Sequence, residues 1–381
     1  MRIGIVCYPT FGGSGVLATE LGKALADEGH QVHFITYQQP VRLNVYNANI
    51  FYHEVSVPTY PLFDYPPYEI ALASTMVDVI TNYDLDLLHV HYAIPHASAA
   101  YMAKQIIKNK TGRNVPIITT LHGTDITLVG RDKTYEPVVT FSINESDAIT
   151  AVSQNLKEET YKNFAIKKDI EVITNFVDVS RFNKKPFDAF KKVIAPNGEK
   201  ILVHASNFRK IKRVDDVIKV FAEVSKHIPA KLLMVGDGPE RHAMEELTRD
   251  LQVTDHVRFV GKQEQIEEIL AVCDAFLLTS EYESFGLAAL EAMAAKSIVI
   301  ATNAGGLPEI ILQNKTGFMA NIGDVKSMSE FAIKILSNEE ALAEMKEAAY
   351  THSLHFDIKN IIPQYEEIYK KFCRQEHCTY L

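Results

Sequence analysis

The feature that most constrains this 381-residue chain is a regular alternation of short apolar runs with longer amphipathic stretches. Such alternation is typical of β-α units that build a parallel sheet. Two sets of strand-like runs occur: Arg2–Cys7, Val32–Thr36, Leu87–Val90, Ile117–Leu121 and Ala148–Val152, then Ile201–Ala205, Lys231–Val235, Val257–Val260, Ala275–Leu278 and Ile298–Ala301. Two sets of about five runs predict two similar α/β lobes, and the chain length also favours two domains.

The lobes are expected to join within residues 170–200, where loop formers end in a Pro-Asn-Gly turn before the next strand-like run. The predicted domains are therefore residues 1–170 and residues 171–355. The segment Ile358–Cys373 is amphipathic and predicts a C-terminal helix over about residues 356–375.

Composition excludes several classes of protein. The net charge of -9 argues against a nucleic-acid partner, because affinity for phosphates needs a basic face. No apolar run reaches the ~18 residues that span a bilayer, and the first residues enter a strand-like run without a signal-type pattern. The sequence leaves the oligomeric state open, a homo-oligomer included.

Cysteine usage indicates the cellular compartment. Because the four cysteines contain no CxxC pair, a disulfide framework is not expected. This pattern favours a reducing compartment, so we expect a cytoplasmic protein. The cysteines are Cys7, Cys273, Cys373 and Cys378.

A glycine-rich loop, Pro9–Gly15, follows the first strand-like run, and a helix is expected from about Val16. Glycines let a ligand approach the backbone, and a helix start offers N–H groups to an anion. The alternative is a tight turn without a ligand. Residues 13–18 also fit the dinucleotide fingerprint, but the second strand ends within His33–Gln39 without the acidic residue that would hold a ribose. This argues against a nicotinamide dehydrogenase.

Histidines gather at predicted strand ends, where open α/β sheets bind ligands. His89 and His91 alternate along one strand, so both rings are expected on one face. We expect a structural role for His89, and we take His91 and His122 as site candidates because they lie where strands become loops. Histidines and Asp125 could also bind zinc, but zinc-enzyme spacings such as HExxH are absent, and no metal is predicted.

A basic stretch follows the first strand of the second lobe. Arg209, Lys210, Lys212 and Arg213 lie together just before a helix expected near Asp215. Such a run can be a solvated surface. Its position at a strand-to-helix switch favours a diphosphate site, since arginine can bind phosphate oxygens in pairs. A second glycine turn at residues 235–239 is consistent with a nucleotide-binding wall.

Two glutamates mark the most informative segment, residues 280–291. Glu283 precedes a Ser-Phe-Gly turn that opens a helix, and Glu291 lies about two turns later. Either residue alone would be an ordinary surface glutamate. Together they can face one crevice and accept hydrogen bonds from the hydroxyls of a sugar and a ribose. The glycine loop Gly305–Glu309 follows at the end of another strand-like run.

These features together resemble the retaining glycosyltransferases of the GT-B fold that carry the E-x7-E motif, a spacing that Glu283 and Glu291 reproduce. Six motifs occur in the family's order over nearly the whole chain: the first glycine loop, HGTD, the basic stretch, VGDGP, ESFGLAALEAMA and GGLPE. The resemblance implies an α/β fold of two Rossmann-like domains facing a central cleft. It also implies acceptor binding in the first domain, nucleotide-sugar binding in the second, and a C-terminal helix that packs back on the first.

Four segments are most similar to the branch of this family that transfers N-acetylglucosamine from UDP-N-acetylglucosamine to L-malate, the first step of bacillithiol biosynthesis. The segments are CYPTFGGSG at 7–15, LHVHYAIPHA at 88–97, TTLHGTDIT at 119–127 and SNFRKIKR at 206–213. The resemblance implies a hexosyltransferase that retains the α configuration and uses neither metal nor cofactor. The chain departs from the common family pattern at Asn207, where many members carry arginine.

The resemblance also implies roles for individual residues. Glu291 is expected on the ribose hydroxyls, Glu283 near the 3-hydroxyl of the donor sugar, and His122 near its 6-hydroxyl. The residues implied in catalysis are His122, Arg209, Lys212 and Glu283, of which Arg209 and Lys212 neutralise the diphosphate. The residues implied in donor binding are Gly13, Arg209, Lys212, Gly236, Glu283, Phe285, Gly286, Leu287 and Glu291. Malate has two carboxylates, so its pocket needs donors, for which we select Ser14, Tyr92, Thr120 and Arg131.

Three alternatives stay open. The acceptor could be another sugar, an inositol or a lipid, although the aromatic segment Pro58–Tyr68 lacks the basic residues expected for a membrane acceptor. A sugar-nucleotide epimerase would convert the donor without any acceptor. A non-catalytic sugar-nucleotide sensor would bind the donor without turnover.

Overall fold

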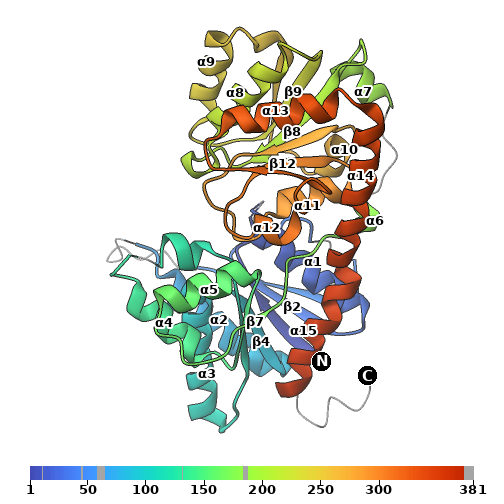
Figure 1. Cartoon of the computed structure of the whole chain (residues 1–381). Coiled ribbons are helices and arrows are strands. Elements are labelled where there is room, and N and C mark those ends of the chain that lie inside the picture. Colours follow the sequence, from blue (N-terminus) through green and yellow to red (C-terminus); the bar gives the residue numbers. More distant parts are fainter. Residues whose placement is uncertain (11, 44–45, 58–64, 131, 183–187, 373–381) are drawn as a thin grey trace. The chain divides into compact units, whose positions relative to one another are not determined.

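The computed structural model describes residues 1–10, 12–43, 46–57, 65–130, 132–182 and 188–372. The packing of the backbone divides the chain into two compact units (Figure 1). Unit 1 comprises Met1–Asn175 together with the chain from Ile358 onward, and unit 2 comprises Phe176–Asp357. Three residues named above, Arg131, Cys373 and Cys378, lie outside the described residues, as does most of the segment Pro58–Tyr68.

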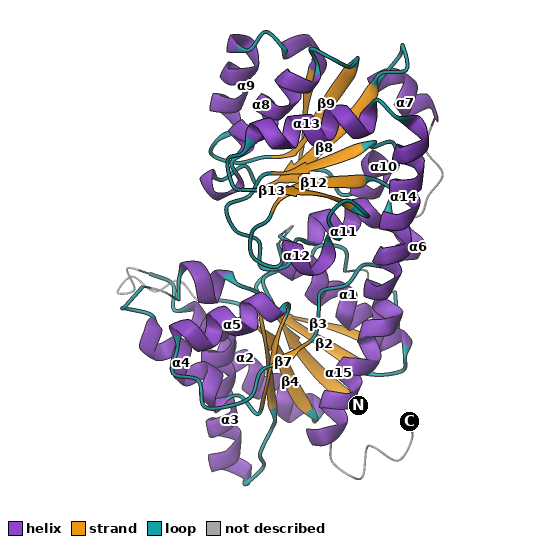
Figure 2. Cartoon of the chain, viewed as in Figure 1, coloured by secondary structure: helices purple, strands orange, loops and turns teal. Residues whose placement is uncertain are grey.

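Unit 1 is built on a parallel sheet of seven strands in the order β3-β2-β1-β4-β5-β6-β7 (Figure 2). Five of these strands match predicted apolar runs, while β3 and β7 were not predicted. Both lie at the edges of the sheet, where β3 is only partly buried and β7 has two residues, so neither carries a strong apolar pattern. The strands are β1 Arg2–Val6, β2 Gln31–Thr36, β3 Ile50–Glu54, β4 Leu87–His91, β5 Ile117–Leu121, β6 Ala148–Ala151 and β7 Glu171–Val172.

The apolar core of unit 1 forms where helices α2 and α3 pack on strand residues such as Val6, Leu88 and Val90. Small alanines on α3 let this helix approach α2 closely. The helices of unit 1 are α1 Gly13–Asp27, α2 Tyr68–Tyr83, α3 Ser98–Thr111, α4 Glu136–Glu145, α5 Gln154–Asn163 and α15 Ile358–Phe372, with shorter turns at Ala93–Ala97 and Thr124–Leu128.

The C-terminal helix α15 joins unit 1 through specific polar contacts as well as apolar packing. The Tyr369 hydroxyl lies 2.7 Å from Nδ1 of His89, and both side chains are fully buried. Directly before β2, Nε2 of His30 lies 2.9 Å from the carboxylate of Glu366 on α15. The side chain of His89 therefore serves the packing of α15, the structural role that its sequence position suggests.

Unit 2 is built on a parallel sheet of six strands in the order β10-β9-β8-β11-β12-β13 (Figure 2). The unpredicted strand here is β13, again at an edge; it has four residues and starts with glycine. The strands are β8 Lys200–Ser206, β9 Ala230–Gly236, β10 Val257–Gly261, β11 Ala275–Leu278, β12 Ile298–Thr302 and β13 Gly317–Ala320.

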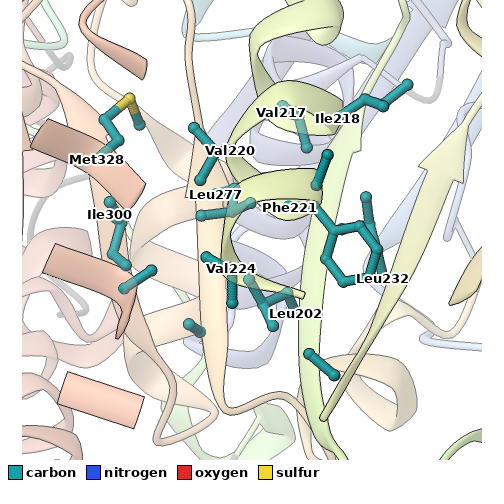
Figure 3. Packing of buried hydrophobic residues seen from close by; sticks show 14 of the residues in the cluster. Leu202, Val217, Ile218, Val220, Phe221, Val224, Leu232, Leu277, Ile300 and Met328 are labelled. Atoms are coloured by element: carbon teal, nitrogen blue, oxygen red, sulfur yellow. The ribbon is translucent and has the colours of Figure 1, made fainter. Parts of the chain in front are cut away.

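Figure 3 shows the core of unit 2, in which Leu202, Leu277 and Ile300 from the sheet meet Phe221 of α8 and Met328 of α13. Two helices, α6 and α7, fall in the segment expected to be loop-rich. The helices of unit 2 are α6 Val179–Phe182, α7 Asp188–Ile194, α8 Val214–Val224, α9 Arg241–Asp250, α10 Ile266–Leu270, α11 Leu287–Ala294, α12 Leu307–Ile310, α13 Val325–Leu336 and α14 Glu339–Ser353. Single turns occupy Lys210–Lys212, Thr254–His256 and Leu354–Phe356.

In both sheets the order of the strands reverses at an equivalent place. In unit 1 this switch point lies between β1 and β4, and in unit 2 between β8 and β11. Open α/β sheets bind ligands outside the carboxyl ends of the strands at such a point. The loops that leave these four strands are therefore where functional side chains are expected. No helix in the described part of the chain is long and apolar enough to cross a bilayer.

Candidate functional site

The loops that leave β8 and β11 bring together two residues predicted for the donor. Lys212 Nζ lies 2.5 Å from Glu283 Oε1, and the two side chains are 21% and 15% exposed. The hydroxyl of Ser280 donates a second hydrogen bond, of 2.7 Å, to the same carboxylate oxygen. The ammonium group of Lys212 is thus held in one place by a carboxylate on the neighbouring loop of the switch point.

The basic loop is also fixed through its backbone. The Thr279 hydroxyl donates to the carbonyl oxygens of Lys212 and Arg213, at 3.1 and 2.8 Å. The N–H of Glu281 donates to the Ile211 carbonyl at 2.8 Å. Thr279 and Ser280 were not predicted as site residues, although their position directly after β11 could have indicated them.

Of the four cations of the basic stretch, Lys212 and Arg213 contact carboxylates, and the other two are exposed. The guanidinium of Arg213 lies 2.6 Å from Asp216 and 3.3 Å from Glu281, and its hydrogen bond to Asp216 is the main reason that its pKa is raised. Arg213 is therefore committed to the local structure. Arg209 and Lys210 are exposed to solvent.

Glycines keep the backbone of this site closely packed. Gly305 has φ +59°, and a Cβ there would lie 2.0 Å from the Glu283 carbonyl oxygen. Gly236, at the end of β9, has φ +116°, and its Cβ would lie 1.8 Å from the Ser206 carbonyl oxygen. Side chains at these positions would displace the loops that carry Glu283 and the basic stretch.

The remaining predicted donor residues surround the start of α11. Gly286 precedes the helix with φ +98°, and Leu287 is its first residue. The Phe285 ring is buried and packs edge-on against Phe356 at 5.8 Å between centroids, so only its main chain is available to a ligand. Glu291 lies on α11 and is half-buried.

In unit 1, the loops that leave β1 and β4 bring together two predicted acceptor residues. The hydroxyls of Ser14 and Tyr92 lie 2.6 Å apart. Helix α1 starts at Gly13 rather than near Val16, so Gly13 and Ser14 lie in its first turn. A Cβ on Gly15 would lie 2.3 Å from the Tyr8 carbonyl oxygen, which explains the need for glycine there.

Two buried histidines of β4, His89 and His91, lie next to the half-buried His122 that follows β5. His89 and His91 stack at 4.5 Å between ring centroids, so both rings do share one face of the sheet. Nδ1 of His91 lies 2.8 Å from Nε2 of His122. Burial lowers the pKa of His122 to about 3, so this ring is uncharged at neutral pH. The ring of His122 lies 5.1 Å from that of Tyr92.

Thr120, predicted for the acceptor, is fully buried on β5. Its hydroxyl lies 2.7 Å from both His89 and Thr150, within the network that anchors α15. We therefore leave Thr120 out of the proposed acceptor site. Arg131, the other predicted anion-binding residue, lies outside the described residues.

Asp125 is a residue whose importance the sequence indicated only through the HGTD motif. Its carboxylate is 2% exposed and accepts the N–H groups of Ala93 and Gly123 at 2.8 and 3.1 Å. Burial raises the pKa of this carboxyl to about 6, against the effect of these hydrogen bonds. Within the described residues, no group of three or more His, Cys, Asp or Glu side chains is arranged to hold a metal ion.

Comparison with known proteins places both units among glycosyltransferases. Residues 11–181 match the model of the Glycosyltransferase Family 4, and residues 187–352 match that of the Glycosyl transferases group 1. The chain is 47% identical over 378 residues to N-acetyl-alpha-D-glucosaminyl L-malate synthase of Bacillus anthracis, covering 99% of this chain and 98% of the relative. It is 25% identical over 370 residues to an uncharacterized glycosyltransferase of Methanocaldococcus jannaschii, covering 96% of each chain.

A solved structure has the same fold as this chain. Anabaena Alr3699/HepE in complex with UDP and glucose superposes with a TM-score of 0.82 at 20% identity, over 97% of this chain and 99% of that one.

Proposed function

Because this chain belongs to the GT-B glycosyltransferases, in the family that includes N-acetyl-alpha-D-glucosaminyl L-malate synthase, we propose that it transfers N-acetylglucosamine from UDP-N-acetylglucosamine to L-malate. The observation that carries this proposal is the 47% identity that extends over 99% of the chain, because it includes the residues of both units. The product is N-acetyl-α-D-glucosaminyl L-malate, formed with retention of the anomeric configuration.

Unit 2 holds the donor in this proposal. Glu291 accepts hydrogen bonds from the ribose hydroxyls, and Glu283 binds the hydroxyls of the sugar. Lys212 and Arg209 bind the diphosphate, while Gly236 and Gly286 allow the nucleotide close to the main chain. The contact between Lys212 and Glu283 at the switch point of the sheet supports this assignment.

The chemistry depends on the charge of the leaving group. As the bond between the anomeric carbon and the phosphate oxygen breaks, negative charge grows on UDP and positive charge on the sugar. A cation held in place before the donor arrives stabilises this transition state more than the ground state. Lys212, fixed by Glu283, is such a cation, and the proposed mechanism needs no divalent metal.

Retention follows from attack on the face that the phosphate leaves. The malate hydroxyl oxygen forms the new bond to the anomeric carbon, and its proton passes to the departing phosphate oxygen. Glu283 is a binding group here and not a nucleophile, since its carboxylate is engaged by Lys212 and Ser280.

Unit 1 holds the acceptor. Malate carries two carboxylates, which require hydrogen-bond donors or cations. The paired hydroxyls of Ser14 and Tyr92, together with the predicted cation Arg131, provide this chemistry. Neutral His122 lies beside them at the end of β5 and is proposed to contact the donor sugar.

We place the reaction in a reducing, cytoplasmic environment, where the free and buried thiols of Cys7 and Cys273 stay reduced.

Product analysis tests the proposal directly. Incubation of the protein with UDP-N-acetylglucosamine and L-malate is expected to give one glycoside whose anomeric proton shows the small coupling constant of an α linkage. Glycerol, inositol and a simple sugar are tested in parallel as acceptors. Turnover with one of these but not with malate would assign a different acceptor, and conversion of the donor without any acceptor would indicate an epimerase.

The role of Glu291 is tested through the ribose. Replacing Glu291 by glutamine is expected to weaken UDP binding by roughly 10- to 100-fold, because hydrogen bonds to a charged acceptor contribute about 1.5–3 kcal/mol. Calorimetry with UDP and 2′-deoxy-UDP gives a sharper result: the wild type should prefer UDP, and the variant should lose this preference. Glu347→Gln, which removes a surface partner of Lys296, is the matched control. An unchanged preference in Glu291→Gln would remove Glu291 from the ribose site.

A further inference from the structure

One buried carboxylate connects the two loops that carry the proposed acceptor residues. Asp125 Oδ2 accepts the N–H of Ala93 at 2.8 Å, and Oδ1 accepts the N–H of Gly123 at 3.1 Å. Ala93 directly follows Tyr92 in the loop after β4, and Gly123 directly follows His122 in the loop after β5. A carboxylate that accepts main-chain N–H bonds forms a strong and directional link.

The backbone on both sides of this link is unusual. Tyr92 has φ +89° and Gly123 has φ +111°, and a tyrosine rarely adopts such a conformation without restraint. The restraint also fixes where the side chains lie, since the Tyr92 hydroxyl is 2.6 Å from Ser14 and its ring is 5.1 Å from that of His122. Asp125 therefore binds the main chain directly after two residues, Tyr92 and His122, and Tyr92 in turn contacts Ser14.

We infer that Asp125 is a positioning residue for the acceptor: without touching a substrate, it holds the loop after β4, and with it Tyr92, in the arrangement that receives the anionic acceptor. This inference rests on the proposed function. The charge of Asp125 has a second consequence, because it adds to burial in raising the pKa of Tyr92. The Tyr92 hydroxyl is protonated at neutral pH and can donate a hydrogen bond to a carboxylate.

The chain offers a matched control at the opposite end of the same sheet. Asp86 is 3% exposed, and its carboxylate accepts the N–H of Arg2 at 2.8 Å, at the start of β1. Asp125→Asn and Asp86→Asn remove the same charge from buried carboxylates that bind main-chain N–H groups. They differ in whether the carboxylate lies beside the proposed acceptor residues.

The test measures kcat and KM for both substrates in the wild type and the two variants. Asp125→Asn is expected to lower kcat/KM for L-malate on the order of 10²-fold, the effect of a small misplacement of groups that hold a reactant. The KM for UDP-N-acetylglucosamine should stay within about threefold, because most of the proposed donor residues belong to unit 2. Asp86→Asn should leave kcat and the KM for each substrate within about threefold, because Asp86 lies at the start of the strands, beside Arg2. Tyr92→Phe combined with Asp125→Asn should lose less than the product of the two single effects, because Asp125 acts through Tyr92.

The outcomes separate this inference from the proposed function. A wild type that does not use malate contradicts the proposed function. A wild type that uses malate, with Asp125→Asn equal to Asp86→Asn or impaired equally for donor and acceptor, overturns the positioning role alone. If thermal unfolding shows that Asp125→Asn does not fold, Gly123→Ala is measured instead, because it strains the same loop at φ +111°. A selective loss for malate is again expected, and an equal loss for both substrates overturns the inference.

Discussion

Replacing Lys212 by alanine is expected to lower kcat on the order of 10³-fold, the size of effect seen when one preorganised electrostatic group is removed from an active site. The variant loses a cation aimed at the leaving group. It also leaves the Glu283 carboxylate, 15% exposed, as an uncompensated negative charge close to the proposed diphosphate. Single-turnover kinetics at saturating donor would report this loss in the chemical step.

The neighbouring Lys210 provides the control for Lys212. It belongs to the same basic stretch but is exposed, so Lys210→Ala should change kcat by less than about threefold. In a double-mutant cycle, Glu283→Gln should cost less in the Lys212→Ala background than in the wild type, because the two groups are in contact. Equal kcat values for Lys212→Ala and Lys210→Ala would mean that Lys212 does not stabilise the leaving group.

Mild acid is expected to lower the free energy of unfolding by several kcal/mol. Burial lowers the pKa of six histidines far below the ordinary value of 6.5: to about 4 for His33, His96 and His204, to about 3 for His89 and His122, and well below 6.5 for His91. Below pH 6.5 the unfolded chain binds protons that the folded protein does not, so stability falls as the pH drops. Each such histidine contributes up to about 1.4 kcal/mol per pH unit until its folded pKa is reached.

One group acts in the opposite direction. Asp125 has a raised pKa of about 6, so the folded protein takes up a proton there before the unfolded chain does. As the pH falls below 6, this uptake offsets the effect of about one histidine on the free energy of unfolding. Five of the six histidines belong to unit 1, so hydrogen exchange near pH 5 should show unit 1 opening before unit 2.

A histidine variant tests this pH dependence. His33→Gln should reduce the pH dependence of stability by about one proton. A stability that is constant between pH 7 and 5 would contradict the burial of neutral histidines.

The sequence predicted the parts of the fold that have strong local patterns. The central strands of both sheets are continuous apolar runs because they are covered on both faces. The edge strands β3, β7 and β13 are short or half-exposed, and so they carry no such signal. The helices α6 and α7 were missed because they have only four and seven residues, too few for a helical period to show in the sequence.

The site was predictable where it depends on topology. Lys212 with Glu283, and Ser14 with Tyr92, come from loops that leave adjacent parallel strands, and strand order alone brings such loops together. Contacts that do not follow from strand order were not predictable. The environment of Thr120 depends, through His89, on Tyr369 of α15, a helix far along the chain.

In the proposed mechanism, fixed cations of the protein, and not a bound metal ion, stabilise the departing diphosphate. The most direct measurement is the release of UDP from UDP-N-acetylglucosamine, with and without L-malate, by protein treated with excess EDTA. We expect rapid release that requires malate and is unchanged by the chelator. Release that disappears with EDTA and returns on adding Mg²⁺ or Mn²⁺ would contradict this mechanism.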